Sequence, residues 1–105
     1  MIIRSAILEG SVADADSSQF DQQMRGPVLD AIATYPGIRS VKLRRLVQAD
    51  AGTPPVYMVF DLYFDDIAAM DAALASPTRQ AVRAQVAQSM SNFKGRIYHQ
   101  VFELG

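Results

Sequence analysis

The stretch from Val56 to Asp66 restricts the possible folds of this chain more than any other. Its residues alternate, so an extended strand here would carry one wholly hydrophobic face. The members of that face are Val56, Met58, Phe60, Leu62 and Phe64. The opposite face carries Tyr57, Val59, Asp61 and Tyr63. A strand with helices on one side and water on the other is usually polar on its wet side. The stretch therefore predicts a strand that is covered on both faces.

Length and composition predict one packed globular domain spanning residues 1–105. A chain of this size buries roughly two thirds of its unfolded surface, and 50% of its residues are hydrophobic against 20% charged. The formal net charge of −1 gives no general attraction to nucleic acid or to an anionic membrane. The absence of cysteine excludes disulfides and thiolate chemistry. Arg4 and Glu9 interrupt the apolar N-terminal stretch too early for a signal or membrane-spanning helix, so we expect a cytoplasmic protein with no membrane partner.

The first half of the chain predicts a strand, a helix and a second strand. Residues 2–9, ended by Gly10, are hydrophobic on both alternating sets, which favours a central strand. A helix then follows, with Asp16, Ser17 or Ser18 as its N-cap and an expected kink or break at Gly26-Pro27. Its apolar stripe is Phe20, Met24, Val28, Ile32 and Tyr35. Residues 38–48 carry clustered Arg and Lys side chains and predict an edge strand.

The second half repeats this order. Asp65 or Asp66 can cap a helix that follows the central strand, and Ser76-Pro77 begins a further helical segment. Residues 96–104 form the last expected strand, which contains the only histidine. The order βαββαβ predicts an α+β, ferredoxin-like fold: a four-stranded antiparallel sheet with its helices on one face. The bare face would be an unusually large apolar patch, so we expect a second copy to cover it in a homodimer, the dimeric α+β barrel.

Four short motifs resemble the EthD-like family of dimeric α+β barrels, and together they span most of the chain. They are Phe20-x-x-x-Met24-Arg25-Gly26-Pro27-Val28, Tyr35-Pro36-Gly37-Ile38, the segment Val59 to Asp65, and Ala75-Ser76-Pro77. The resemblance implies a homodimer with a small-molecule pocket between sheet and helices. The family's name links it to degradation of ethyl tert-butyl ether, and related barrels act as cofactor-free monooxygenases, cyclases and isomerases.

The sequence departs from the family pattern at three positions. Arg25 stands where the family usually has a histidine, Asp61 where it has a glutamate, and Tyr63 where it has a tryptophan. Arginine cannot act as a base at neutral pH, although its guanidinium can hold an anion through a forked contact. A catalytic role for the family's histidine would therefore not carry over to Arg25.

The candidate site residues each have two interpretations. Asp61 is the candidate catalytic base, or else it forms a structural ion pair with Arg4 or Arg25. The candidate ligand-pocket residues are Phe20, Met24, Arg25, Tyr57, Tyr63 and His99. Of these, Phe20 and Met24 fit a helix core first and a pocket wall second. The tyrosines fit a dimer seam equally well, and His99 fits a hydrogen-bonded core or rim position on its strand better than a base or ligand. One histidine without clustered carboxylates is a poor metal site, so no metal and no cofactor are expected.

Two functions remain open at the level of sequence. One is an enzyme that acts on a small apolar or aromatic compound without a cofactor, using groups such as Asp61, Arg25 and a tyrosine. The other is a non-catalytic ligand-binding or accessory homodimer on the same scaffold. An RNA-recognition module shares the strand order, but residues 56–64 lack its basic-glycine start and spaced aromatics.

Overall fold

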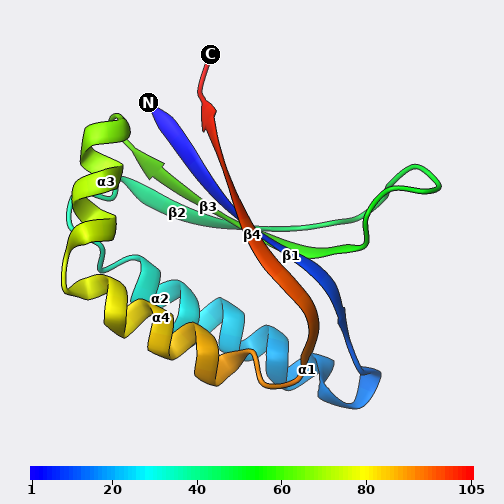
Figure 1. Ribbon diagram of the computed structural model, residues 1–105. Coiled ribbons are helices and arrows are strands. Elements are labelled where there is room, and N and C mark those ends of the chain that lie inside the picture. The colour runs from blue at the N-terminus through cyan, green and yellow to red at the C-terminus, as the bar shows by residue number, and fades with distance from the viewer.

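The computed structural model describes residues 1–105 as a four-stranded antiparallel sheet with helices packed on one face (Figure 1). The strand order is β2-β3-β1-β4, which gives the expected ferredoxin-like βαββαβ arrangement. The strands are β1 (Ile2–Val12), β2 (Ser40–Arg45), β3 (Val56–Phe64) and β4 (Phe93–Glu103). The helices are α1 (Asp14–Gln23), η1 (Met24–Val28), α2 (Leu29–Ile32), α3 (Ile67–Ala75) and α4 (Thr78–Ser89). None of these helices is both long enough and apolar enough to cross a membrane.

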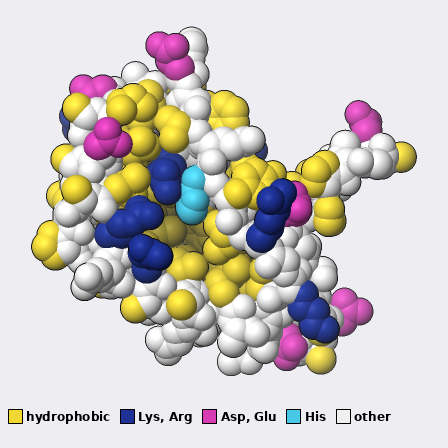
Figure 2. All heavy atoms as spheres, in the orientation of Figure 1, with side chains coloured by type: hydrophobic (Ala, Val, Ile, Leu, Met, Phe, Trp, Pro, Cys, Tyr) yellow, Lys and Arg dark blue, Asp and Glu magenta, His cyan; other side chains and the backbone are white.

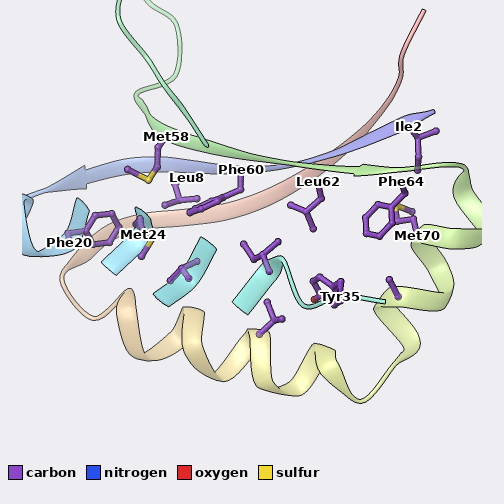
Figure 3. Close-up of a cluster of buried hydrophobic side chains, with 14 residues drawn as sticks. Ile2, Leu8, Phe20, Met24, Tyr35, Met58, Phe60, Leu62, Phe64 and Met70 are labelled. Carbon is purple, nitrogen blue, oxygen red and sulfur yellow. The ribbon is translucent and has the colours of Figure 1, made fainter. Parts of the chain in front are cut away.

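The two central strands are those expected from the sequence, β1 and β3. Their register runs from Ile2 opposite Phe64 to Leu8 opposite Met58. These four side chains are buried and point toward the helices, where they form the core with residues of α1, η1 and α3 (Figure 3). The expected edge position of β2 is also confirmed, although this strand is shorter than residues 38–48.

A β-bulge reverses the expected sides of two residues at the start of β3. The register between β1 and β3 shifts at Leu8/Glu9, so that Glu9 pairs with Val56 and Tyr57 has no partner on β1. Tyr57 consequently packs with the core, edge-to-face against Phe20 at 5.4 Å between ring centroids. The expected assignment of Val56 to the helix side and Tyr57 to the other side was wrong, because strict alternation does not survive a bulge.

Two glycines let β1 and β4 run further than expected. Gly10 and Gly95 pair directly, and their φ angles are +149° and +151°. A Cβ atom at Gly95 would overlap the carbonyl oxygen of Glu9. These glycines therefore lie inside strands, where the backbones approach closely. The predicted strand ends at Gly10 and Arg96 were wrong for this reason.

The first helical segment starts earlier than the sequence suggested, continues through Pro27, and ends at Ile32, before Tyr35 of the expected stripe. It starts at Asp14 with Ala13 as N-cap and no capping side chain, so the expected caps at residues 16–18 were wrong. Pro27 lies within the π-helical turn η1, and the helix continues into α2 instead of breaking. A π-turn is a common way to absorb an irregularity in the backbone ladder, here the missing N–H of proline.

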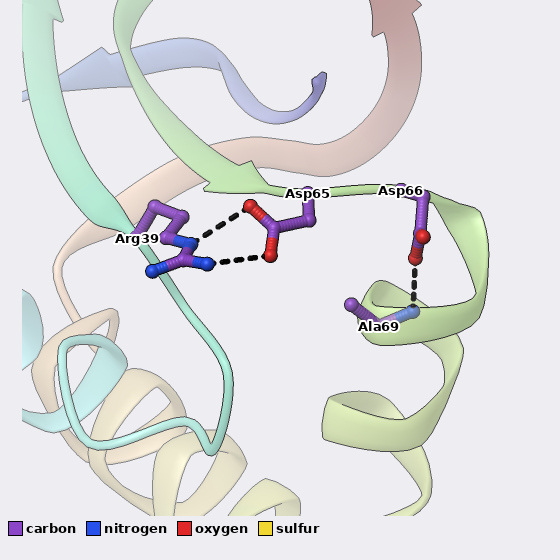
Figure 4. A network of polar contacts seen from close by, with 4 residues as sticks. All are labelled: Arg39, Asp65, Asp66 and Ala69. Carbon is purple, nitrogen blue, oxygen red and sulfur yellow. Dashed lines mark hydrogen bonds and ion pairs between the residues drawn. The ribbon is translucent and has the colours of Figure 1, made fainter.

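The link from β3 to α3 follows the expected capping. The carboxylate of Asp66 accepts a hydrogen bond from the Ala69 backbone N–H at 2.8 Å, which makes it the N-cap of α3 (Figure 4). The preceding Asp65 pairs with Arg39 through two hydrogen bonds, of 2.8 and 2.7 Å. This contact joins the start of β2 to the end of β3.

Candidate functional site

The structure contains a cavity of about 380 Å³ between the sheet and the helices, called here the sheet–helix cavity. Eighteen residues line it, and fourteen of them are hydrophobic. Leu8, Phe60 and Leu62 contribute from the sheet, while Val82 and Val86 contribute from α4. Its size and apolar lining lie in the range usual for small-molecule sites.

The only four lining residues that are not hydrophobic all carry basic side chains. Arg4 comes from β1, Arg79 and Arg83 come from α4, and His99 comes from β4. Figure 2 shows the single histidine, in cyan, beside dark blue side chains around an apolar hollow. The cavity therefore combines an apolar interior with basic groups at its mouth.

Strand register and helix spacing bring these four groups together. Ala6 pairs with His99 on β4 and with Phe60 on β3, so these residues share the helix-covered face. Arg4 lies two positions along the same strand and therefore faces the same way. Arg79 and Arg83 are four residues apart on α4, which places them on one side of that helix.

The environment of the cavity changes the titration of two of these groups. Burial, with the charges of Arg4 and Arg79, lowers the pKa of His99 from its ordinary value to about 4. Burial is also the main cause that lowers the pKa of Arg4, and the charge of Arg79 adds to it. At neutral pH the imidazole is thus uncharged and able to accept a proton, while the arginines keep their charge.

Asp61 lies on the other face of the sheet, called here the open face because no helix covers it. Asp61 is buried, with its side chain only 7% exposed. Ser5 Oγ donates to it at 2.7 Å, and the guanidinium of Arg44 makes two hydrogen bonds to its oxygens, at 2.5 and 3.1 Å. The ion-pair partner is therefore Arg44, and the expected pairing with Arg4 or Arg25 was wrong because β2 brings its own arginine onto this face.

The structure separates the predicted site residues into three groups. Met24 and His99 line the sheet–helix cavity. Phe20 and Tyr57 form an aromatic cluster with Phe93, where the ring centroids lie 5.4 to 6.2 Å apart. The other three do not line the cavity: Arg25 is exposed on η1, Asp61 lies on the open face, and Tyr63 lies there beneath the ammonium of Lys42.

Sequence reasoning missed Arg79 and Arg83, which resemble a solvated helix face. One sequence signal does mark them. The segment Thr78–Ser89 contains no acidic residue, so neither arginine has a partner on its own helix. Both lie within one turn of Val82, which is buried on α4, and this spacing places them at the edge of the buried side of that helix.

No protein-family model matches the sequence, and no curated protein sequence matches it. Solved structures do match. An ethyl tert-butyl ether degradation (EthD) family protein from Bacillus halodurans superposes with a TM-score of 0.78 over 100% of both chains, at 18% identity. The chain shares the fold of this EthD family protein. The expected resemblance to the EthD-like family is thus confirmed at the level of the fold.

Two other solved structures share the arrangement. A DABB family protein with a ferredoxin-like fold from Mesorhizobium loti has a TM-score of 0.68 at 15% identity, over 99% of this chain and 98% of that one. SnoaB, a cofactor-independent oxygenase from Streptomyces nogalater, has a TM-score of 0.62 at 16% identity, over 98% and 91%. At 15 to 18% identity, the similarity to these three solved structures establishes the fold and does not by itself assign a function.

Proposed function

We propose that this protein binds a small apolar or aromatic compound in the sheet–helix cavity. The observation that carries the proposal is the cavity itself, about 380 Å³ in volume and hydrophobic at fourteen of its eighteen lining residues. Burying an apolar ligand there would remove hydrophobic surface from water, while the few polar groups at the mouth orient it. A cytoplasmic role in the degradation of such compounds is part of this proposal.

The proposal includes a homodimer that forms through the open face. Phe102 is 49% exposed on this face, and Leu46 and Val47 at the start of the β2–β3 connection are 48% and 96% exposed. A second hollow of about 640 Å³ lies among these residues, beside Arg44. Sheet-to-sheet packing of two copies would cover this apolar surface and enclose the hollow.

A second candidate function is catalysis without a cofactor, and the observation that favours it is the position of His99. The free imidazole is a weak base, but the anion left by a bound carbon acid or phenol would pair with Arg4 and Arg79, offset the charges that lower the pKa of His99, and so allow it to take the proton. Asp61 is the alternative base, on the open face behind Ser5 and Arg44, two residues that line the hollow there. The fold likeness to a cofactor-independent oxygenase supports this function.

Binding is tested with 2-naphthamide, a neutral aromatic probe, titrated by NMR or calorimetry. Ala87 lines the cavity from α4, whereas Ala84 lies on the same helix outside the lining. We expect Ala87→Trp to fill the cavity and weaken binding at least about tenfold, which is the scale of losing one well-packed group. Ala84→Trp should leave binding unchanged. Equal binding by both variants would contradict the proposed location.

Catalysis is tested by pairing two variants that remove a base on opposite faces of the sheet. Turnover of small phenols, followed by oxygen uptake and product NMR, should be lost in His99→Gln and retained in Asp61→Asn. Binding of 2-naphthamide should be retained in both. Loss of turnover only in Asp61→Asn would place the chemistry on the open face.

A further inference from the structure

We infer that the ligand of the sheet–helix cavity is a hydrophobic acid, whose carboxylate is held at the mouth by Arg4, Arg79 and Arg83. This inference rests on the proposed function of the cavity as the ligand site and adds the chemical class of the ligand. Its basis is a group of cationic side chains for which the protein itself supplies no counter-charge.

The basic charges around the cavity have no acidic partner; outside the cavity the same is true only of Arg25, Lys42 and Lys94, which are exposed. Four other arginines each pair with a carboxylate. These pairs are Arg39–Asp65, Arg44–Asp61, Arg45–Asp21 and Arg96–Glu9, with N–O distances of 2.5 to 3.3 Å. Arg4, Arg79 and Arg83 form no such pair, and no acidic residue lines the cavity. The basic charge at the mouth is therefore available to a ligand.

Placing these basic side chains close together is electrostatically unfavourable in the protein without a ligand. Arg79 and Arg83 stand four residues apart on α4, a spacing at which like charges repel. Arg4 is partly buried beneath them, and its charge and that of Arg79 both disfavour protonation of His99. A bound anion would reverse each of these effects, because it attracts all the cationic groups at once.

The apolar interior determines what kind of anion fits. A guanidinium offers a planar fork of N–H donors that matches a carboxylate. Immediately behind the basic groups the walls are hydrophobic, with Phe60 on the sheet and Val86 on α4. A ligand with a charged end and an apolar body satisfies both regions, whereas a multiply charged or wholly polar anion would leave the walls unfilled.

The test compares three probes at pH 7: 2-naphthoate, its neutral isostere 2-naphthamide, and inorganic phosphate. We expect naphthoate to bind at least about tenfold more tightly than the amide, since hydrogen bonds to charged groups are among the stronger ones. Phosphate, which has the charge without the apolar body, should bind more weakly than naphthoate.

Three arginine variants test whether the preference for naphthoate over naphthamide arises at the cavity mouth. Arg79→Gln and Arg83→Gln, both on α4, should each reduce naphthoate affinity severalfold and change amide affinity less than twofold. Arg96→Gln, on β4 and outside the cavity, should change neither. Because both α4 variants keep a polar side chain on a helix surface, they should fold, and thermal unfolding verifies this.

The other outcomes separate the inference from the proposed function. Equal affinity for acid and amide overturns the inference and leaves the cavity as a neutral-ligand site. An acid preference that is lost in Arg96→Gln but kept in both α4 variants also overturns it. The same comparison is made with a phenyl pair, benzoate and benzamide, and with an octanoyl pair, octanoate and octanamide. If no acid and no amide of the three pairs binds, both the inference and the proposed function are wrong.

Discussion

Arg4 and His99 lie on neighbouring strands and face the same cavity, where the charge of Arg4 adds to burial in lowering the pKa of His99 to about 4. The antiparallel register sets this relationship, because Arg4 pairs with Val101, two positions beyond His99. Arg79 then approaches from α4 and acts in the same direction. Two neighbouring strands, β1 and β4, and the helix α4 thus supply all of the basic groups at the cavity mouth.

The titration of His99 is the first prediction. Its imidazole should titrate near pH 4 in the folded protein, against about 6.5 when unfolded. Between these values the unfolded chain holds one more proton at this residue, so protonation favours unfolding there. The His99 contribution to the free energy of unfolding is therefore constant above about pH 6.5 and falls as the pH drops toward 4.

Imidazole NMR signals followed from pH 3 to 8 measure the titration directly. Denaturant unfolding of the wild type and His99→Gln over the same range isolates the contribution of His99 from that of the carboxylates. An imidazole that titrates near 6.5 in the folded protein would contradict the described environment.

The homodimer is tested by two aspartate substitutions at equally exposed hydrophobic residues. Phe102 is 49% exposed on the open face, and Ile67 is 48% exposed at the start of α3. Phe102→Asp would place an unpaired charge in the dimer interface and should yield monomers. Ile67→Asp should remain dimeric, since an acidic residue in the first turn of a helix is favourable.

Light scattering at micromolar concentration gives the mass of each variant. The wild type and Ile67→Asp should show twice the chain mass of 11.5 kDa, and Phe102→Asp should show one chain mass. A monomeric wild type, or a dimeric Phe102→Asp, would contradict the proposed interface.

Alanine should have opposite effects on stability at Gly95, where β1 and β4 approach closely, and at Gly26, in the helix. Gly95→Ala places a Cβ against the Glu9 carbonyl and keeps an unfavourable φ, so it should reduce the free energy of unfolding by about 1–3 kcal/mol. Gly26 lies in a helix, and apart from its chain neighbours and the adjacent helix backbone no atom lies within 4 Å of the position that an alanine Cβ would take. Gly26→Ala should therefore increase stability by up to about 1 kcal/mol. Denaturant unfolding measures both, and a Gly95→Ala protein as stable as the wild type would contradict the described pairing.

The buried ion pair at Asp61 predicts a loss of stability without a loss of ligand. Asp61→Ala leaves Ser5 without its acceptor and Arg44 without its counter-charge, which should cost about 1–3 kcal/mol. Because Asp61 and the cavity lie on opposite faces of β3, naphthoate affinity should stay within twofold. Asp65→Ala, which removes an exposed carboxylate paired with Arg39, serves as the control and should change stability much less. Reduced naphthoate affinity in folded Asp61→Ala would contradict the separation of the two faces.

Alternating hydrophobicity was sufficient to predict the order of elements, the two central strands and the edge position of β2. It failed where the backbone departs from regular geometry. The bulge moved Tyr57 into the core, and the π-turn let the helix pass Pro27. Neither irregularity has a strong local signal, because each depends on how distant segments pack together.

The cavity was harder to predict than the fold. Both alternating sets of β1 are apolar, so the side on which Arg4 lies depends on the register with β3 and β4. Arg79 and Arg83 can be recognised as cavity residues only once α4 is known to lie over that same face of the sheet. The absence of acidic residues from α4 was the one local indication.

A crystal structure of the protein with 2-naphthoate tests the central claim most directly. We expect the naphthyl ring between Phe60 and Val86, with the carboxylate within hydrogen-bond distance of Arg79 or Arg4. A ligand bound on the open face beside Asp61, with the sheet–helix cavity unchanged, would contradict the claim.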